Sequence, residues 1–267
     1  MANRGVTGGR SIYYCHTPPR FLYDLRDRYQ RTFPAWQRPL LAVLRNWLQP
    51  RYEAAVRGMD VVLANSRNVQ SRLQHYLGVS SQVVYPPVET DCFRWLGDDG
   101  YFLSTARLEP LKRVDILVRA FRRMPSQQLV IASGGSEFAR LQALAADAPN
   151  IRFTGWLNDE QLARLMGEAR ASIYVPVDED FGMSPVESMA AGKPVIGVAE
   201  GGLLETVVDG ETGILLPAQF DENDMIEAAS GLDAHRTRQM RCACEAQAQR
   251  FSAARFLEEI EAVLHCS

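Results

Sequence analysis

The stretch ASIYVPVDEDFGMSPVESMAAGKPVIGVA, Ala171–Ala199, decides the fold. It opens with a short apolar run at 171–176 and passes through an acidic loop that contains a Phe-Gly pair. Apolar residues three or four apart follow, and a second apolar run closes the stretch at 194–199. Short apolar runs joined by a segment of helical spacing are typical of a strand–helix–strand unit, in which the two strands are parallel.

The same alternation extends on both sides of this stretch. The predicted strands of the region are 101–106, 128–133, 150–155, 171–176, 194–199 and 213–217. Segments between them, such as 114–124 and 159–169, repeat apolar residues every three or four positions. This pattern predicts a parallel sheet covered by helices on both faces, which is a doubly wound, Rossmann-like domain over residues 96–251.

Residues 1–95 are predicted to form a second, partial domain. Apolar runs at 11–18, 60–66 and 82–93 indicate strands, with two or three helices between the first and second of them. Ser66 or Asn65 is a suitable N-cap for the helix at 67–77, and Gly78 is suited to end it. The boundary between the domains is expected near residues 88–99. The final segment, 252–267, is predicted to be an amphipathic helix.

Charge is unevenly distributed along the 267 residues. The net charge is −3, yet residues 1–60 contain ten Lys or Arg and four Asp or Glu. The segment 33–52 could therefore face an anionic membrane surface, or it could form two ordinary packed helices with solvated arginines. No basic cluster recurs after Arg51, so a nucleic-acid partner is not expected.

The chain is expected to be cytoplasmic. It contains no run of about 18 apolar residues, and its first residues lack the apolar region of a secretory signal. The five cysteines are scattered, so they do not indicate a disulfide framework.

Two acids, Glu179 and Glu187, lie on either side of Gly182 where the fourth predicted strand of the sheet gives way to a helix. In an open α/β sheet the ligand binds at the carboxyl ends of the strands. Glycine lets a backbone approach a ligand, and the first amides of a helix attract anions. A phosphate flanked by two acids that bind hydroxyls describes a sugar nucleotide. The competing interpretations are a capping box of Ser184 with Glu187 and a solvated loop position for Glu179.

Two cations, Arg107 and Lys112, follow the strand at 101–106. A planar guanidinium and a compact ammonium at the carboxyl end of a strand suit a diphosphate, although either could be an ordinary surface residue.

The string EDFGMSPVE, Glu179–Glu187, and its continuation to Pro217 resemble the signature of retaining family 4 glycosyltransferases. That resemblance implies an α/β, GT-B-like fold with a complete C-terminal Rossmann-like domain and a truncated N-terminal one. It also implies that 252–267 crosses back to the N-terminal domain. Because the family's N-terminal domain has roughly a hundred more residues before this segment, part of the acceptor side is expected to be absent, leaving a sheet edge that a partner or an oligomer would cover.

The resemblance also implies roles for individual residues. Glu179 would bind the donor sugar, Glu187 the ribose hydroxyls, and Arg107 with Lys112 the diphosphate. YYCHTPPRFLYD resembles a mannosyltransferase-like branch in which His16 faces the donor sugar. The remaining predicted donor contacts are Phe181, Gly182, Met183, Ser184 and the backbone of Leu157, which would meet the base.

The implied activity is transfer of a mannose-like sugar, from a donor of the GDP-mannose type, to an acceptor hydroxyl with retained configuration. No metal or cofactor is expected. The acceptor would be an unidentified glycan or lipid-linked sugar in polysaccharide or glycolipid biosynthesis, reached in the cytoplasm or peripherally at the inner face of the membrane. The alternative is a catalytically impaired nucleotide-sugar-binding or scaffold protein. An epimerase or phosphorylase is disfavoured because the catalytic groups expected of them are absent.

Overall fold

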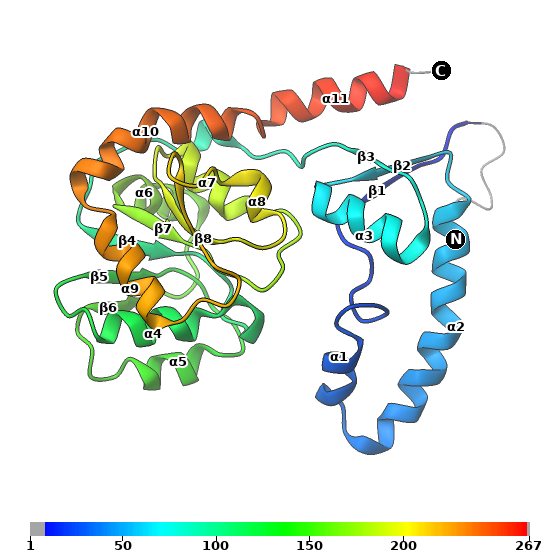
Figure 1. The fold of residues 1–267 in the computed structure, drawn as a ribbon, viewed down its shortest axis with the longest axis horizontal. Coiled ribbons are helices and arrows are strands. Elements are labelled where there is room, and N and C mark those ends of the chain that lie inside the picture. Colours follow the sequence, from blue (N-terminus) through cyan, green and yellow to red (C-terminus); the bar gives the residue numbers. More distant parts are fainter. Residues whose placement is uncertain (1–8, 266–267) are drawn as a thin grey trace. The chain divides into compact units, whose positions relative to one another are not determined.

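The computed structural model describes residues 9–265, so the expectations for the first residues and for Cys266 lie outside the described part. The chain divides into two compact units, Met1–Tyr85 and Pro86–Ser267 (Figure 1). The division falls after Tyr85, whereas the sequence pattern predicted it after residue 95. The reason is that the intervening segment is bonded to the second unit: the Val88 amide donates to the Phe251 carbonyl at 3.0 Å. That the last helix crosses back to the first domain stays a prediction.

The second unit contains a six-stranded sheet in which every strand pairing is parallel, in the order β6-β5-β4-β7-β8-β9. All six strands were predicted, and the α/β fold class is confirmed. Their bounds are β4 Tyr101–Ser104, β5 Gln128–Ile131, β6 Ile151–Phe153, β7 Ala171–Ile173, β8 Val195–Val198 and β9 Gly213–Leu216. Strands β4, β7 and β8 are buried along their whole length, which explains why they read as continuous apolar runs.

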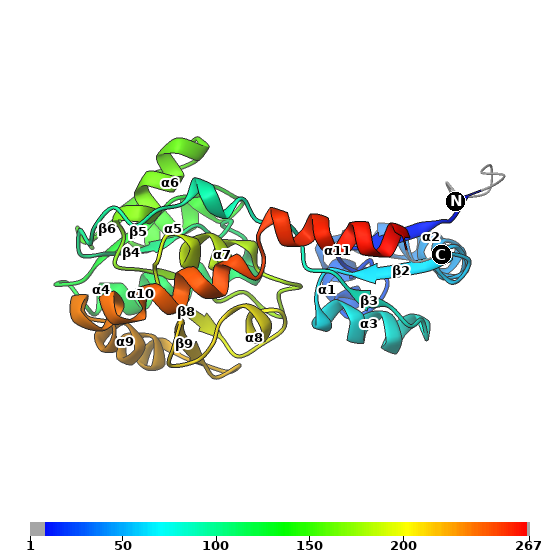
Figure 2. The same ribbon diagram turned by 90° about the horizontal axis from the view of Figure 1, so that it is seen from above.

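Helices cover both faces of this sheet. The helices α4 and α5 lie below the strands in Figure 1, while α6 and α7 lie above them. Helix α10 packs along α7, as Figure 2 shows, and α9 packs on α4. The helical bounds are η3 Thr90–Cys92, η4 Pro110–Lys112, α4 Val114–Arg122, α5 Phe138–Leu144, α6 Asp159–Glu168, α7 Met183–Ala190, α8 Leu203–Thr206, α9 Glu222–Gly231, α10 Ala234–Gln249 and α11 Ala253–His265.

The strand order creates a switch point between β4 and β7. From β4 the chain moves outward to β5 and β6 on one side, and from β7 it moves outward to β8 and β9 on the other. The loops that leave β4 and β7 therefore diverge at the carboxyl edge of the sheet. This is the position at which open α/β sheets bind their ligands.

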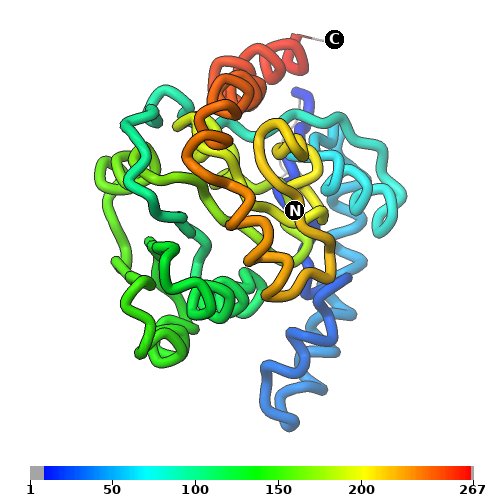
Figure 3. Tube along the Cα trace, turned by 60° about the vertical axis from the view of Figure 1, so that its left-hand side comes forward, coloured from blue at the N-terminus to red at the C-terminus, as the bar shows by residue number. Residues whose placement is uncertain are grey.

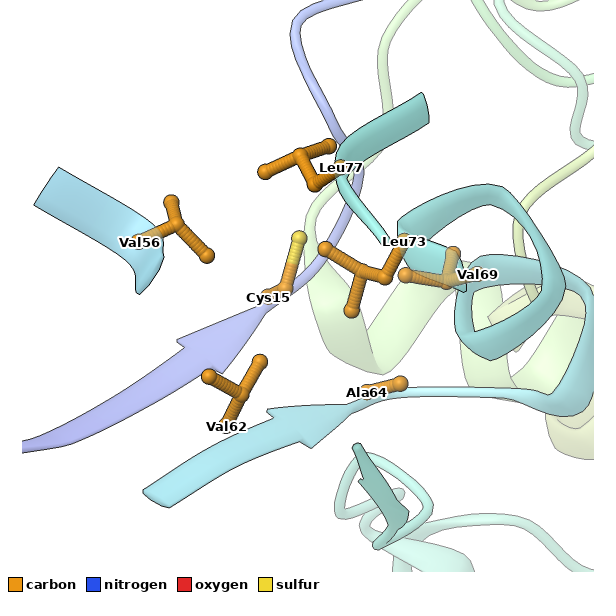
Figure 4. Packing of buried hydrophobic residues seen from close by; sticks show 7 residues of the cluster. All are labelled: Cys15, Val56, Val62, Ala64, Val69, Leu73 and Leu77. Carbon is orange, nitrogen blue, oxygen red and sulfur yellow. The ribbon is translucent and has the colours of Figure 1, made fainter. Parts of the chain in front are cut away.

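The first unit has a three-stranded parallel sheet, in the order β1-β2-β3. Its elements are β1 Ile12–Cys15, α1 Arg26–Thr32, η2 Ala35–Gln37, α2 Arg38–Arg57, β2 Val61–Ala64, α3 Arg67–Leu77 and β3 Gln82–Val83. Apolar residues of β1, β2, α2 and α3 converge in a small core, shown in Figure 4: Cys15, Val56, Val62, Ala64, Val69, Leu73 and Leu77.

The predicted caps of α3 are confirmed. The Ser66 hydroxyl accepts a hydrogen bond from the Val69 amide at 3.0 Å, and Gly78 ends the helix in the left-handed region with φ of 64°.

The helices α1 and α2 bury fewer residues than two ordinary packed helices would, and ordinary packing was one of the two interpretations of this region. Helix α1 buries no residue and α2 buries only Val56, near its end. Figure 3 shows the chain reversing between them, so that α1 and the first half of α2 form a hairpin. Within residues 9–265, no helix is both long enough and apolar enough to cross a bilayer.

Candidate active site

Lys112 and Glu179 meet at the switch point of the second sheet. Lys112 lies at the end of η4, after β4, and Glu179 lies in the loop after β7. The Lys112 Nζ donates to Glu179 Oε2 at 2.6 Å and to the Tyr174 hydroxyl at 3.1 Å. Both ion-paired side chains are 23% exposed, so the pair is shielded yet open to a ligand. Glu179 is therefore not the solvated loop acid of the competing interpretation.

The Tyr174 hydroxyl is influenced by three of the charged side chains predicted for the site, which are Glu179, Glu187 and Arg107. Burial is the main cause of its raised pKa, followed by the negative charges of Glu179 and Glu187, while Arg107 opposes the shift. All three predicted side chains therefore act electrostatically on this hydroxyl. The sequence analysis missed Tyr174, although it follows directly after β7, where functional side chains were expected.

An arginine holds the β7 loop in place. The Arg113 guanidinium donates to the carbonyls of Val175 and Pro176, each at 2.7 Å, and to Glu200 Oε2 at 3.1 Å. Glu200 also accepts from the Asp178 amide at 3.0 Å. Burial lowers the pKa of Arg113, and the charge of Glu200 opposes that effect. Arg113 and Glu200 thus connect the β4, β7 and β8 loops, and the sequence analysis missed both.

Two glycines give the loop its path. Gly182 is the N-cap of α7 with φ of 89°, a conformation that L side chains rarely adopt, and no side chain caps the helix. The helix therefore begins at Met183, and the competing interpretation, a capping box of Ser184 with Glu187, is excluded. Because the first amides of a helix have no intrahelical partner, this end of α7 can receive an anion. Gly202 donates its amide to the Glu179 carbonyl at 2.8 Å, which ties the acidic loop to the chain after β8.

Replacing Gly202 with alanine is expected to lower the free energy of unfolding by about 1–3 kcal/mol. The new Cβ would lie 2.4 Å from Phe181 Cα and 2.6 Å from the Asp180 carbonyl oxygen, so the backbone of the Glu179 loop would have to move. Chemical denaturation measures the loss. Gly231→Ala is the matched control, since its Cβ would meet only the Arg236 side chain, at 3.4 Å. Equal stability of the two variants would contradict the close packing of Gly202.

The other predicted residues of the second unit occupy different environments. The Arg107 side chain is 65% exposed and lies 3.7 Å from Glu109. Phe181 is 3% exposed and its ring packs edge-on against Phe251, so its predicted contact with the donor stays a prediction. Met183 is exposed and Ser184 partly exposed at the start of α7. The Leu157 side chain packs on an apolar cluster that includes Leu103 of β4 and Val130 of β5, and the contact of its backbone with the base stays a prediction.

His16 belongs to the first unit. It is exposed directly after β1, and its ring lies edge-on to Tyr14 with centroids 5.0 Å apart. Its role beside the donor sugar stays a prediction.

Metal ligands do not gather in the described part of the chain: residues 9–265 contain no group of three or more His, Cys, Asp or Glu side chains arranged to hold an ion. The Cys242-Ala-Cys244 pair is split, since Cys242 is exposed whereas Cys244 is buried and has its pKa raised to about 12 by burial. The prediction that no metal is needed stays a prediction.

Proteins of known name are similar to this chain in sequence. An alpha-1,3/1,6-mannosyltransferase of Rhizomucor pusillus is 27% identical over 80% of this chain and 57% of its own length. A GDP-mannose-dependent alpha-(1-6)-phosphatidylinositol monomannoside mannosyltransferase of Mycolicibacterium smegmatis is 32% identical over 59% of this chain and 49% of its own. The chain thus spans about half the length of these curated relatives.

A solved structure supports the fold class. The Anabaena protein HepE, in complex with UDP and glucose, superposes with a TM-score of 0.74 at 20% identity, over 96% of this chain and 71% of its own. The predicted GT-B-like fold is confirmed.

The family called glycosyl transferases group 1 matches residues 93–249, which include Lys112, Glu179 and Glu187. Because this match spans more than half of the sequence, the chain belongs to the glycosyl transferases group 1 family.

Proposed function

We propose that this chain transfers a mannose-like sugar from a nucleotide-sugar donor to an acceptor hydroxyl, with retention of configuration. The observation that carries the proposal is the Lys112–Glu179–Tyr174 cluster at the switch point of the sheet. It sets a cation for phosphate beside a carboxylate for sugar hydroxyls. The start of α7, which follows the Glu179 loop in the chain, supplies backbone amides that no side chain caps.

In the proposed reaction, the bond between the sugar's anomeric carbon and the diphosphate oxygen breaks. A bond from the acceptor oxygen to that carbon forms on the same face, and the acceptor proton passes to the departing phosphate. Negative charge grows on the diphosphate as it leaves. Arg107, Lys112 and the amides of Gly182–Ser184 stabilise that charge more than they stabilise the bound donor. This scheme uses no metal and no protein base.

Glu179 acts on the sugar in this scheme. Its carboxylate accepts hydrogen bonds from sugar hydroxyls and favours positive charge at the anomeric carbon. An ammonium carries three donors, so Lys112 can keep its bond to Glu179 while it donates to a phosphate. His16 faces the donor sugar and Leu157 meets the base.

Glu187 is proposed to accept hydrogen bonds from the ribose hydroxyls. The burial of its carboxyl group allows a separate test by pH. Burial, and secondarily the charge of Asp159, raise its pKa above 4.5. Its contribution to stability is therefore complete below pH 4.5 and is lost as pH rises through the raised pKa. At about pH 7 the buried carboxylate is penalised for its charge, so Glu187→Gln should raise the melting temperature there. At about pH 4 the carboxyl group is neutral, so the same substitution should leave the melting temperature nearly unchanged.

The same substitution should weaken nucleotide-sugar binding about tenfold to a hundredfold, because it removes a charged acceptor. Calorimetry and thermal melts give the two readouts. Glu211→Gln removes an exposed carboxylate from the same unit and serves as the control. A change in melting temperature that is the same at both pH values would contradict the buried carboxylate.

The donor we propose is GDP-mannose. The names of two relatives, a mannosyltransferase and a GDP-mannose-dependent enzyme, support it. The structure of HepE was solved with UDP and glucose, so UDP-glucose is the competing donor to test. The acceptor is proposed to be a glycan or a lipid-linked sugar, in polysaccharide or glycolipid biosynthesis.

A second candidate is a nucleotide-sugar-binding or scaffold protein without turnover. It needs only donor binding, and the Lys112–Glu179 pair lies wholly within the second unit.

Calorimetry with GDP-mannose and UDP-glucose, followed by single-turnover assays with added glycan acceptors, separates these candidates. Binding with turnover supports the transferase. Binding without turnover on any acceptor supports the scaffold, and preference for UDP-glucose removes the mannose assignment. Absence of binding to either donor contradicts both.

A further inference from the structure

An apolar stripe lies exposed along the first half of α2. Its side chains are between 51% and 77% exposed, although they are large and apolar. They recur at the spacing of one helical face, beginning one turn earlier in η2: Trp36, Leu40, Val43, Leu44 and Trp47. An amphipathic helix normally buries such a stripe, so this one has no cover within its own unit.

The stripe continues into a groove between α1 and α2. This groove encloses about 260 Å³ and is lined mainly by apolar side chains, among them Phe21, Tyr29 and Leu44. Arg26 and Arg45 line it as well. Burial lowers the pKa of Arg45, and the neighbouring charge of Arg26 lowers it further. The nearby charge of Asp27 opposes these two effects, and both arginines lie beside the apolar side chains of the groove.

The α1–α2 hairpin, which we define as residues 20–57, carries a net positive charge. This segment contains eight arginines, no lysine and three acidic residues. At one end of the stripe, the Arg51 guanidinium lies 4.2 Å from the centre of the Trp47 ring. Tryptophan stands at both ends of the stripe, and tryptophan is enriched where protein meets the headgroup region of a bilayer.

We propose that the α1–α2 hairpin docks on the surface of an anionic lipid bilayer. The stripe would enter the boundary between headgroups and acyl chains, with α2 lying in the plane of the membrane. The arginines, including Arg26 and Arg45, would contact lipid phosphates, since a guanidinium matches phosphate oxygens in planar geometry. This docking goes beyond the sugar transfer proposed above and does not depend on it.

Charge favours a bilayer over a second copy of the chain. A symmetric dimer through this stripe would bring the arginines of two hairpins together, and like charges across an interface are unfavourable. An anionic membrane instead supplies the opposite charge over the whole length of the stripe.

The test is co-sedimentation of the full chain with vesicles of phosphatidylcholine alone or mixed with phosphatidylglycerol. Binding is expected to the mixed vesicles only, with weakening by added salt. Arg26→Gln with Arg45→Gln should lower the partition coefficient about thirtyfold, and Leu40→Ser with Leu44→Ser at least tenfold. Leu257→Ser with Leu264→Ser, which changes exposed leucines of α11, is the matched control and should bind as the parent does.

Brominated lipid reports on whether tryptophan side chains enter the bilayer, and two of the four tryptophans of the chain lie in the stripe. Quenching of tryptophan fluorescence on mixed vesicles is expected, because Trp36 and Trp47 would enter the bilayer. Failure to bind the mixed vesicles would overturn the proposal, as would binding that both pairs of substitutions leave unchanged. A concentration-dependent dimer in sedimentation velocity that Leu40→Ser with Leu44→Ser abolishes would assign the stripe to self-association instead.

Discussion

Lys112→Ala is expected to lower turnover about a hundredfold to a thousandfold and to weaken binding of the nucleoside diphosphate. The ammonium is the shielded cation of the site, held 2.6 Å from Glu179 and 3.1 Å from the Tyr174 hydroxyl. A cation fixed in advance loses little energy to reorganisation when charge develops on the leaving group. Single-turnover kinetics and calorimetry with GDP measure the two effects.

The matched control is Arg164→Ala, which removes a cation from another ion pair of the same unit. Arg164 donates to Glu168 at 2.8 Å and is 75% exposed, so both activity and affinity should stay at the parental level. Lys112→Ala also leaves Glu179 without its ammonium partner, so both variants are compared well below their melting temperatures. Unchanged GDP affinity in Lys112→Ala would show that the diphosphate binds elsewhere.

Glu179→Gln is expected to lower turnover about a hundredfold while GDP binds almost as tightly as before. Glutamine keeps the size of the side chain and an oxygen that can accept from Lys112, but it lacks the negative charge. That charge is proposed to favour an electron-poor anomeric carbon, which develops only in the transition state. The effect should therefore appear in kcat more than in nucleotide affinity.

Glu222→Gln tests whether loss of any paired carboxylate has this effect. Glu222 accepts from Arg119 at 2.5 Å where α9 packs on α4, and neither residue is among those proposed to bind the donor. Its substitution should leave kcat unchanged. If Glu179→Gln weakened GDP binding as strongly as it lowered kcat, Glu179 would be organising the phosphate site rather than the sugar.

The sequence was sufficient to predict local features. The six strands of the second sheet, their parallel arrangement, the Ser66 cap and the Gly78 end all depend on residues close together in the chain. The predicted cations and acids of the site could be chosen from the sequence, because residues 107–112 and 179–187 each follow a recognisable strand, and their roles stay predictions.

The start of α7 shows where local reasoning failed. Ser184, Pro185 and Glu187 have the composition of a capping box, yet the helix begins at Met183 after a left-handed Gly182. The path of the loop is set by contacts outside that local sequence: Glu200 accepts from the Asp178 amide, and Gly202 donates to Glu179. Contacts of the preceding loop with residues distant in the chain therefore accompany a helix start at Met183 in place of the one that the local sequence favours, which has Ser184 as its N-cap.

Local sequence is enough to set which segments become strands and which carry charge, because hydrophobic period and turn chemistry act over a few residues. The pairing of Lys112 with Glu179, the bond from Arg113 to Glu200 and the exposure of the apolar face of α2 follow from the three-dimensional packing instead. These outcomes depend on strand order and on which faces find partners. Both are set by contacts between residues far apart in the chain, which no local pattern records.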